Sequence, residues 1–281
     1  MRSAYKGRQR DEIFKANKHR RIDPKLDPFR LGFRESRDSE EHPNSLAIAL
    51  FLDVTGSMGR IPEDLVRHQL GGLMDTLIDN GVQDPQLMFS AVGDQYSDRA
   101  PIQVGQFESS TELINDGLSR LFLEGGGGGG RTESYPLAWH TCGRHTSIDC
   151  WEKRRQKGFL FTVGDEACHR KLEAGKLMEL YGYDQAQDLD DMSMLASARN
   201  MYEVFHIHLN QGSYPNDERV LGYWRERLGQ RLVVLEDYSK LGLLIATIVA
   251  VFSGQRAEDI LQKQDALTQN VLSSSIESTL V

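Results

Sequence analysis

The sequence has few cysteines and no excess of positive charge. Its three cysteines, Cys142, Cys150 and Cys168, form an odd set in one region. Such a set does not suit the disulfide framework of a secreted domain, so we expect a reducing, cytoplasmic environment. The formal net charge of 281 residues is −8. Because nucleic-acid binding depends on clustered cations, a nucleic-acid partner is not indicated by the whole-chain charge.

Long hydrophobic runs and several common enzyme motifs are missing as well. The apolar run Leu241–Phe252 is shorter than the roughly 20 residues that a membrane-spanning helix needs. Residues 1–37 are polar and rich in Lys and Arg, so we expect no signal peptide. The sequence contains no phosphate-binding loop with Lys-Ser or Lys-Thr, no Gly-x-Ser-x-Gly turn and no His-Glu-x-x-His helix. The catalytic classes that these motifs mark are therefore not indicated.

What is present is organised around one stretch near residue 50. The continuous apolar run Leu46–Leu52 predicts a strand buried on both faces, as in the centre of a parallel sheet covered by helices. Asp53, Thr55 and Ser57 follow at once, and a helix is predicted from Ile61 onward. The polar residues thus lie at the carboxyl end of a central strand, where open α/β sheets bind ligands.

These three side chains offer one carboxylate and two hydroxyl groups within a short loop. Hard cations such as Mg²⁺ choose oxygen ligands and retain several water molecules, so the set fits a metal site. A purely structural interpretation also exists, because Thr and Ser often cap helices and Asp often begins a turn. The three residues alone leave both interpretations open.

The stretch Asp53-Val-Thr55-Gly-Ser57 resembles the start of the metal-ion-dependent adhesion site of von Willebrand factor A domains. In that family the motif is followed by a threonine in a glycine-containing loop and by an aspartate after a later strand. Here the Gly125–Gly130 run leads to Thr132, and a predicted strand over 159–163 leads to Asp165. The last element reads Val-Gly-Asp-Glu where many members have Thr-Asp-Gly. The resemblance covers about residues 44–254.

The resemblance implies a fold and a domain organisation. The expected fold is α/β with three layers: a doubly wound, mostly parallel central sheet, helices on both faces and one antiparallel edge strand. The expected organisation is a basic and polar arm over residues 1–43, a domain of the von Willebrand factor A type over 44–254, and a tail over 255–281 that forms a short helix and then becomes disordered toward Ser273–Ser275.

The resemblance also implies a non-enzymatic function. Mg²⁺, with Mn²⁺ or Ca²⁺ as alternatives, would bind a protein partner through that partner's Glu or Asp side chain. The partner could be an AAA+ ATPase, beside which intracellular relatives often act as adaptors. Glu133 would support the ligands. Asp94, which follows a second predicted strand at the same end of the sheet, would orient a metal-bound water or a ligand or, alternatively, form an Asx-type turn. The expected metal ligands are Asp53, Thr55, Ser57, Thr132 and Asp165.

The glycine run and the basic arm each allow two interpretations. Movement of Gly125–Gly130 would bring Thr132 into or out of coordination and give two affinity states, whereas the plain alternative is a flexible linker. The arm over 1–37 either contacts phosphate groups or, as its interleaved acids favour, packs on the domain. The apolar residues expected to pack are Ile13, Phe14, Phe29, Leu31 and Phe33.

The alternative from another class is a Mg²⁺-dependent phosphotransferase or phosphatase of the haloacid-dehalogenase type. Asp53-Val-Thr-Gly-Ser resembles that family's nucleophile motif, and Gly164-Asp165-Glu166 resembles its later acidic motif. Asp53 would then attack phosphorus and form an aspartyl phosphate. Against this, Val follows Asp53, no well-placed lysine stands out, and the glycine run with Thr132-Glu133 is left unexplained.

A zinc cluster is a further alternative for the cysteine-containing region. Cys142, His145 and Cys150, with Cys168-His169 beyond the next strand, are of the types that bind zinc. Their spacings match none of the usual paired zinc knuckles, which favours buried thiols and surface histidines over a zinc site.

The remaining segments are predicted as ordinary α/β scaffold. An alternating pattern over 102–107 predicts a third strand that could lie at an edge, and the resemblance implies that this strand is the antiparallel one. Further strands are predicted over 86–92, 202–209 and 231–235, and helices over 112–123, 171–180, 188–200, 218–228 and 240–252.

Overall fold

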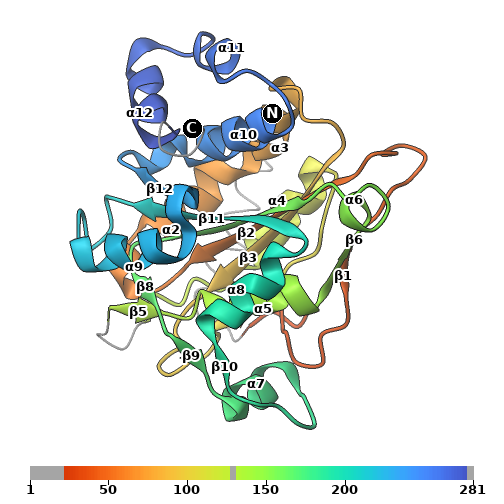
Figure 1. Cartoon of the computed structure of the whole chain (residues 1–281), viewed down its shortest axis with the longest axis vertical. Helices are drawn as coiled ribbons and strands as arrows, with labels where there is room; N and C mark the ends of the chain where they lie inside the picture. Colours follow the sequence, from red (N-terminus) through yellow and green to blue (C-terminus); the bar gives the residue numbers. More distant parts are fainter. Residues whose placement is uncertain (1–21, 127–130, 277–281) are drawn as a thin grey trace, which may run out of the picture.

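A computed structural model describes residues 22–126 and 131–276 of the chain. Its centre is a six-stranded sheet with the strand order β12-β11-β7-β2-β3-β4 (Figure 1). Neighbouring strands are parallel from β12 to β3, and β4 runs antiparallel to β3. The strands span Leu46–Asp53 (β2), Pro85–Val92 (β3), Ile102–Gln103 (β4), Gly158–Gly164 (β7), Tyr202–Leu209 (β11) and Leu232–Leu235 (β12).

Helices cover both faces of this sheet. On one face α3 (Leu73–Asp79) packs against α10 (Leu241–Phe252), and on the other α5 (Pro136–Arg144) packs against α8 (Asp191–Arg199) (Figure 1). Helices α4 (Thr111–Arg120) and α9 (Glu218–Leu228) contact β3 and β11, respectively. This arrangement confirms the predicted fold class, including the antiparallel edge strand.

The central strand forms as the sequence predicts. Every residue of β2 is buried, because β2 lies between β3 and β7 and is covered on both faces. The chain order moves outward from β2 to β3 and then returns to β7 on the other side of β2. Strand order therefore reverses beside β2, and the carboxyl end of β2 is the position where such sheets bind ligands.

The edge strand is shorter than predicted. It ends at Gln103 rather than continuing to residue 107. The amide of Gly105 donates instead to the Ser90 hydroxyl at 3.1 Å, and an added Cβ at Gly105 would collide with the Phe89 carbonyl oxygen. The Ser90 hydroxyl group thus replaces a backbone carbonyl as the acceptor for Gly105, where the backbones of Gly105 and Phe89 lie close together.

The helix predicted after β2 is interrupted. It begins as α2 (Ile61–Asp64), continues through a wide π turn at Leu65–Gln69 and a 3₁₀ turn at Leu70–Gly72, and becomes regular again in α3. Its leucines nevertheless face the core: Leu65, Leu70, Leu73 and Leu77 are all at most 1% exposed.

Two other helices begin later than predicted. Residues 171–172 form strand β9, which pairs antiparallel with β10 (Leu189–Asp190) before the helices α7 (Ala174–Tyr181) and α8 begin. The Asp190 side chain accepts a hydrogen bond from the Ser193 amide, which caps α8 and sets its start. Short elements complete this half: β5 (Thr132–Glu133) pairs with β8 (Ala167–Cys168), and α6 spans Asp149–Glu152.

The segment before the sheet packs through only some of the predicted residues. Leu26 is buried and Leu31 packs partly on the core, whereas Phe29 and Phe33 are 53% and 63% exposed. Strand β1 (Arg34–Ser36) pairs with β6 (Thr146–Ile148). Ile13, Phe14 and the basic residues before 22 lie outside the described residues, so the interpretation of that arm stays a prediction.

The C-terminal segment forms two helices, α11 (Ala257–Leu261) and α12 (Ala266–Ile276). Helix α12 packs against β12, and Ile260 and Leu272 are buried in the main core. The structure differs from the predicted disorder at Ser273–Ser275, because the helix continues through these residues and the Val271 carbonyl accepts hydrogen bonds from Ser274 and Ser275. Residues 277–281 lie outside the description.

No helix within residues 22–126 and 131–276 is long and apolar enough to cross a membrane. The apolar helix α10 has 12 residues and covers the sheet.

Candidate metal centre

The polar side chains singled out from the sequence lie at the carboxyl edge of the sheet. Asp53 ends β2, Asp94 follows β3 and Asp165 follows β7. The loop after β11 reaches the same edge and contributes Ser213. Parallel strands bring these chain positions together although they are far apart in sequence.

A chain of hydrogen bonds connects most of the predicted ligands. Oδ1 of Asp53 accepts from the Thr55 amide at 2.8 Å and from the Thr55 hydroxyl at 2.6 Å. The Thr55 and Ser57 hydroxyl oxygens are 3.2 Å apart. Ser57 then donates to Oδ1 of Asp165 at 2.7 Å. The structure therefore brings Asp53, Thr55, Ser57 and Asp165 into one cluster.

Thr132 has other partners. Its hydroxyl lies 3.2 Å from Nδ1 of His169, and Nε2 of His169 lies 3.0 Å from Oδ1 of Asp94. Thr132 is half-buried on β5, beside Ala167 of β8. No hydrogen bond within the described residues joins Thr132 to the Asp53 cluster, so its place as a ligand stays a prediction.

Two residues that the sequence did not single out hold the cluster in place. The Tyr135 hydroxyl donates to Oδ2 of Asp53 at 2.5 Å. Ser213 donates through its amide to Oδ2 of Asp165 at 2.6 Å and through its hydroxyl to the Ser57 carbonyl at 2.7 Å. Tyr135 stands close behind Thr132 in the sequence, which is a weak signal. Ser213 has none beyond following a predicted strand.

Two buried acidic side chains lie behind this cluster. Glu133 and Glu166 are 4% and 2% exposed, and Oε2 of each has no hydrogen-bond partner within the described part of the chain. Burial and the nearby Asp53 carboxylate raise the pKa of Glu133 to about 12. Burial also raises the pKa of Glu166. The predicted supporting role of Glu133 is thus compatible with its position near Asp53.

Asp53 itself is fully buried. Burial raises its pKa to about 7, while hydrogen bonds from Thr55 and Tyr135 act in the opposite direction. Desolvation of a carboxylate is costly without an opposite charge. A divalent cation would supply that charge and would favour the ionised forms of these acids.

The start of the glycine run lies against the Asp53–Ser57 loop. The Gly56 amide donates to the Gly126 carbonyl, and the Gly125 amide donates to the Val54 carbonyl at 3.1 Å. A Cβ at Gly56 would lie 2.9 Å from the Gly126 oxygen, so only glycine allows this close approach. Residues 127–130 lie outside the description, so the predicted movement of this loop stays a prediction.

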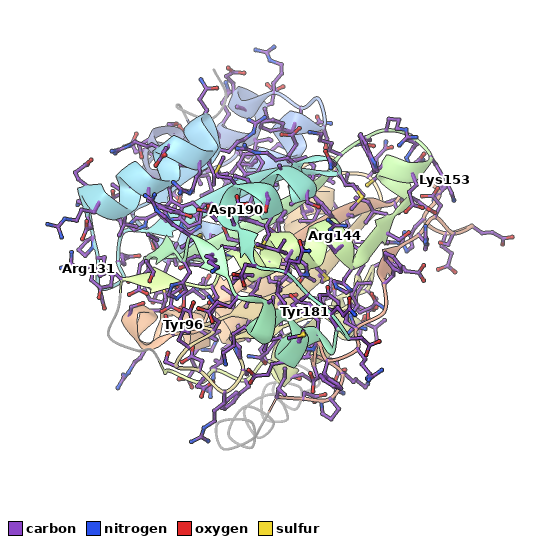
Figure 2. The ribbon with its side chains drawn as sticks, turned by 60° about the horizontal axis from the view of Figure 1, so that its bottom comes forward. Tyr96, Arg131, Arg144, Lys153, Tyr181 and Asp190 are labelled. Atoms are coloured by element: carbon purple, nitrogen blue, oxygen red, sulfur yellow. The ribbon has the colours of Figure 1, made fainter. Side chains whose placement is uncertain are left out.

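A surface pocket of about 440 Å³ adjoins Thr132 and His169. Its lining residues include Arg131, Arg170 and Arg219. Arg131 pairs with Asp217 at 3.1 Å. Arg131 and Tyr96, both labelled in Figure 2, are each more than half exposed. The surroundings of the cluster therefore include cationic groups near an acidic centre.

The cysteine-containing region does not assemble as one group. Cys142, Cys150 and Cys168 are buried free thiols. In residues 22–126 and 131–276, no three His, Cys, Asp or Glu side chains are grouped as a metal site. The Asp53 cluster combines two carboxylates with hydroxyl groups, a donor set typical of Mg²⁺.

No family model matches the chain, and no curated protein matches it. Among solved structures, the chain is similar to proximal thread matrix protein 1 from the mussel byssus, with 12% identity over 74% of this chain and a TM-score of 0.48. It is also similar to the pilus adhesin SpaC from Lactobacillus rhamnosus GG in its open conformation, with 9% identity over 81% of this chain and a TM-score of 0.46. The chain spans 48% and 31% of the lengths of these two proteins. Similarities at this level identify neither a family nor a function.

Proposed function

We propose that the chain is a metal-dependent protein-interaction module of the von Willebrand factor A type. The cation is Mg²⁺, held by Asp53, Thr55, Ser57 and Asp165, with Thr132 joining the shell. The observation that supports this most is the 2.7 Å hydrogen bond from Ser57 to Asp165. It joins two separate parts of the sequence motif in one oxygen-rich cluster.

The residues present fit a hard cation. Few carboxylates and two hydroxyl groups form the cluster, and the buried acids behind it have oxygen atoms without hydrogen-bond partners among the described residues. Mg²⁺ supplies an electrophilic centre to which a partner's carboxylate can bind. Tyr135 and Ser213 orient the carboxylates of Asp53 and Asp165 through the hydrogen bonds described above.

The accessible side of the cluster is where a partner would bind. Asp53 and Asp165 are fully buried, whereas Ser57 and Thr132 are half-buried. The arginine-lined pocket beside Thr132 suits a partner segment with further acidic side chains. An AAA+ ATPase as the source of this segment stays a prediction from the family resemblance.

The burial of Asp53 favours binding over phosphoryl transfer. The Asp53 side chain is fully buried. A nucleophilic aspartate must meet the phosphoryl group of its substrate, which is much larger than a metal ion. This arrangement favours the interaction module over an enzyme that forms an aspartyl phosphate. The experiment below also tests for that enzyme.

The test uses synthetic peptides that each carry one Asp or Glu, selected for binding to the full chain in Mg²⁺ and released with chelator. We expect selected peptides to lose at least tenfold in affinity when the acid is changed to Asn or Gln. Ser57→Ala should weaken binding similarly, while Ser274→Ala, on the exposed side of α12, should not. Binding that persists in chelator and tolerates the amide would contradict the proposal. A beryllofluoride adduct on Asp53 would favour the enzyme instead.

A further inference from the structure

A second group of metal-binding side chains lies at the far end of α5. This helix begins next to Tyr135, beside the candidate centre, and carries His140 in its second turn and His145 just past its end. Nε2 of His140 lies 2.8 Å from the hydroxyl oxygen of Tyr183. Nε2 of His145 is hydrogen-bonded to the same oxygen. Three potential donor atoms therefore meet at one point, outside the cluster of Asp53.

The orientation of His145 is fixed by its other contacts. Nε2 of His145 faces the Tyr183 hydroxyl group. A neutral imidazole whose proton is on Nδ1 has the Nε2 lone pair that binds metals. The ring planes of His145 and Tyr183 differ by 12°, and Tyr181 stacks on His145 with centroids 5.1 Å apart. These ring contacts hold Nε2 of His145 toward the phenol oxygen.

Without an ion, these three groups can satisfy one another. The Tyr183 hydroxyl group can donate its proton to one imidazole and accept a hydrogen bond from the N–H of the other, so a bound ion would replace these hydrogen bonds. His140 is 5% exposed. Burial lowers its pKa to about 3, so that it is a neutral imidazole at physiological pH. Two neutral imidazoles and a phenol are a donor set for borderline transition-metal ions rather than for Mg²⁺.

The distances suit a small ion after a modest adjustment. Zinc-nitrogen bonds of about 2.0 Å at tetrahedral angles place ligand atoms about 3.3 Å apart. The contacts to Tyr183 are shorter than this, so the ion requires the phenol to move outward. Tyr183 is half-buried and follows Gly182, which ends α7 in a left-handed conformation. This position after the helix allows that adjustment, and its partial exposure leaves room for a water ligand.

We propose that His140, His145 and Tyr183 form a second metal site, which binds a borderline divalent ion of the Zn²⁺ or Cu²⁺ class through two Nε2 atoms and the Tyr183 oxygen. The phenol proton is released to solvent when the ion binds, and water takes the fourth position. This site is independent of the proposed Mg²⁺ centre.

The test titrates the full-length protein with Cu²⁺ and Zn²⁺ in excess Mg²⁺, by calorimetry and visible absorption. We expect one tight ion per chain and, with Cu²⁺, a phenolate-to-metal charge-transfer band. Tyr183→Phe should abolish the band and weaken binding at least tenfold. His140→Gln should weaken binding to a similar extent.

Matched variants distinguish this site from a neighbouring phenol and from the Asp53 cluster. Tyr181→Phe removes a hydroxyl group that is hydrogen-bonded to Thr141 at 2.7 Å. This variant should keep both the charge-transfer band and the affinity for Cu²⁺. Asp53→Ala should also leave Cu²⁺ binding unchanged. Thermal unfolding of each variant verifies that it is folded. Absence of the band in the wild type, or binding by folded Tyr183→Phe within twofold of the wild type, would overturn the proposal.

Discussion

At the scale of single residues, Gly164 determines how closely Tyr135 can approach Asp53. It ends β7 directly before Asp165. A Cβ at this position would collide with the Tyr135 hydroxyl and lie 2.8 Å from Oδ2 of Asp53. The absence of a side chain thus lets Tyr135 reach Asp53. Any side chain at position 164 would displace Tyr135 or Asp53, so the cluster requires glycine there.

We therefore expect Gly164→Ala to reduce the free energy of unfolding by about 1–3 kcal/mol, because overpacking displaces Tyr135. It should also weaken Mg²⁺ binding, because Asp53 loses its oriented hydrogen bond. Gly175→Ala is the matched control: nothing lies within 4 Å of its added Cβ in α7. That change should be neutral or stabilise slightly. Denaturant unfolding compares the two, and equal effects would contradict this account of Gly164.

Sequence reasoning at this scale found the cluster but not all of its supports. Asp53, Thr55 and Ser57 were found because they are close together in one loop after an apolar run. Tyr135 and Ser213 reach the cluster only through the packing of α5 and the loop after β11, and sequence separation does not reveal that. The order of the motif elements also did not predict that Thr132 contacts His169. The pairing of β5 with β8 brings these two residues together.

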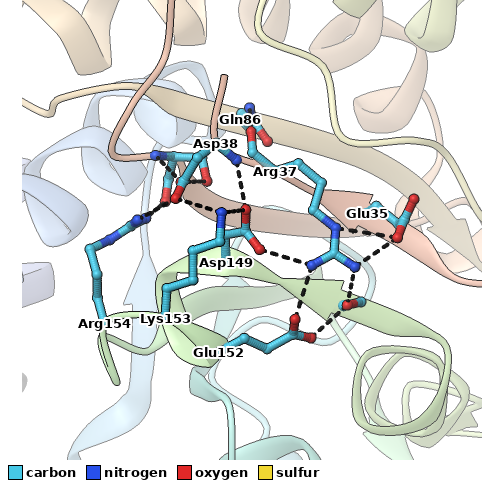
Figure 3. Close-up of polar contacts among 10 residues, drawn as sticks. Glu35, Arg37, Asp38, Gln86, Asp149, Glu152, Lys153 and Arg154 are labelled. Atoms are coloured by element: carbon cyan, nitrogen blue, oxygen red, sulfur yellow. Dashed lines mark hydrogen bonds and ion pairs between the residues drawn. The ribbon is translucent and has the colours of Figure 1, made fainter. Parts of the chain in front are cut away.

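At the scale of elements, an ionic network attaches the segment before β2 to α6 (Figure 3). Arg37 contacts Asp149 at 2.8 Å and Glu152 at 2.9 Å. Asp38 contacts Arg154 at 2.8 Å and Lys153 at 3.2 Å. Asp149 is buried, with 4% of its side chain exposed. This network connects β1 and β6 to the start of the central strand.

We expect Arg37→Gln to destabilise the fold by ~1–2 kcal/mol at neutral pH, because buried Asp149 loses one of its cations. Arg225→Gln is the control. Its pair with Glu218 on α9 is exposed on both sides, so removing it should have little effect. Chemical denaturation of both variants measures the difference. A loss as small for Arg37 as for Arg225 would show that the network contributes little.

The same network predicts a pH dependence. Burial alone would raise the pKa of Asp149, but hydrogen bonds from Lys153, the Asp38 amide and Arg37 outweigh it and lower that pKa below its ordinary 3.8. The unfolded chain therefore binds the proton first as pH falls. The stabilisation is complete above pH ~4 and is lost as the pH falls through the lowered value. The difference between wild type and Arg37→Gln should accordingly shrink below pH ~4, and a constant difference would contradict this.

At the scale of the whole molecule, the mostly parallel sheet was predictable from its apolar strands and from the family resemblance, whereas the order of its strands was not predicted. The run over 46–52 is buried on both faces, as predicted. The C-terminal helix was not predictable to its end. Serine has no strong preference for or against a helix, so the local sequence does not predict where this helix ends. Packing of Leu272 on the core stabilises the helix.

Helix α12 should therefore contribute to global stability. Leu272→Ala removes a fully buried side chain and should cost ~2–5 kcal/mol. Leu267→Ala changes a side chain that is 70% exposed in the same helix and should cost little. A cooperative unfolding transition measured for both variants provides the comparison. Similar midpoints would mean that α12 is not part of the folded core in solution.

The central claim is that the cluster at the carboxyl edge of the sheet binds Mg²⁺. The most direct measurement is calorimetric titration of Mg²⁺, with Mn²⁺ as a second ion, into the wild type and Asp53→Asn. The Asn variant keeps the size of the side chain while removing its charge. We expect one bound ion in the wild type, at least tenfold weaker binding in Asp53→Asn, and unchanged binding in Tyr183→Phe. Absence of binding in the wild type, or equal binding by folded Asp53→Asn, would contradict the claim.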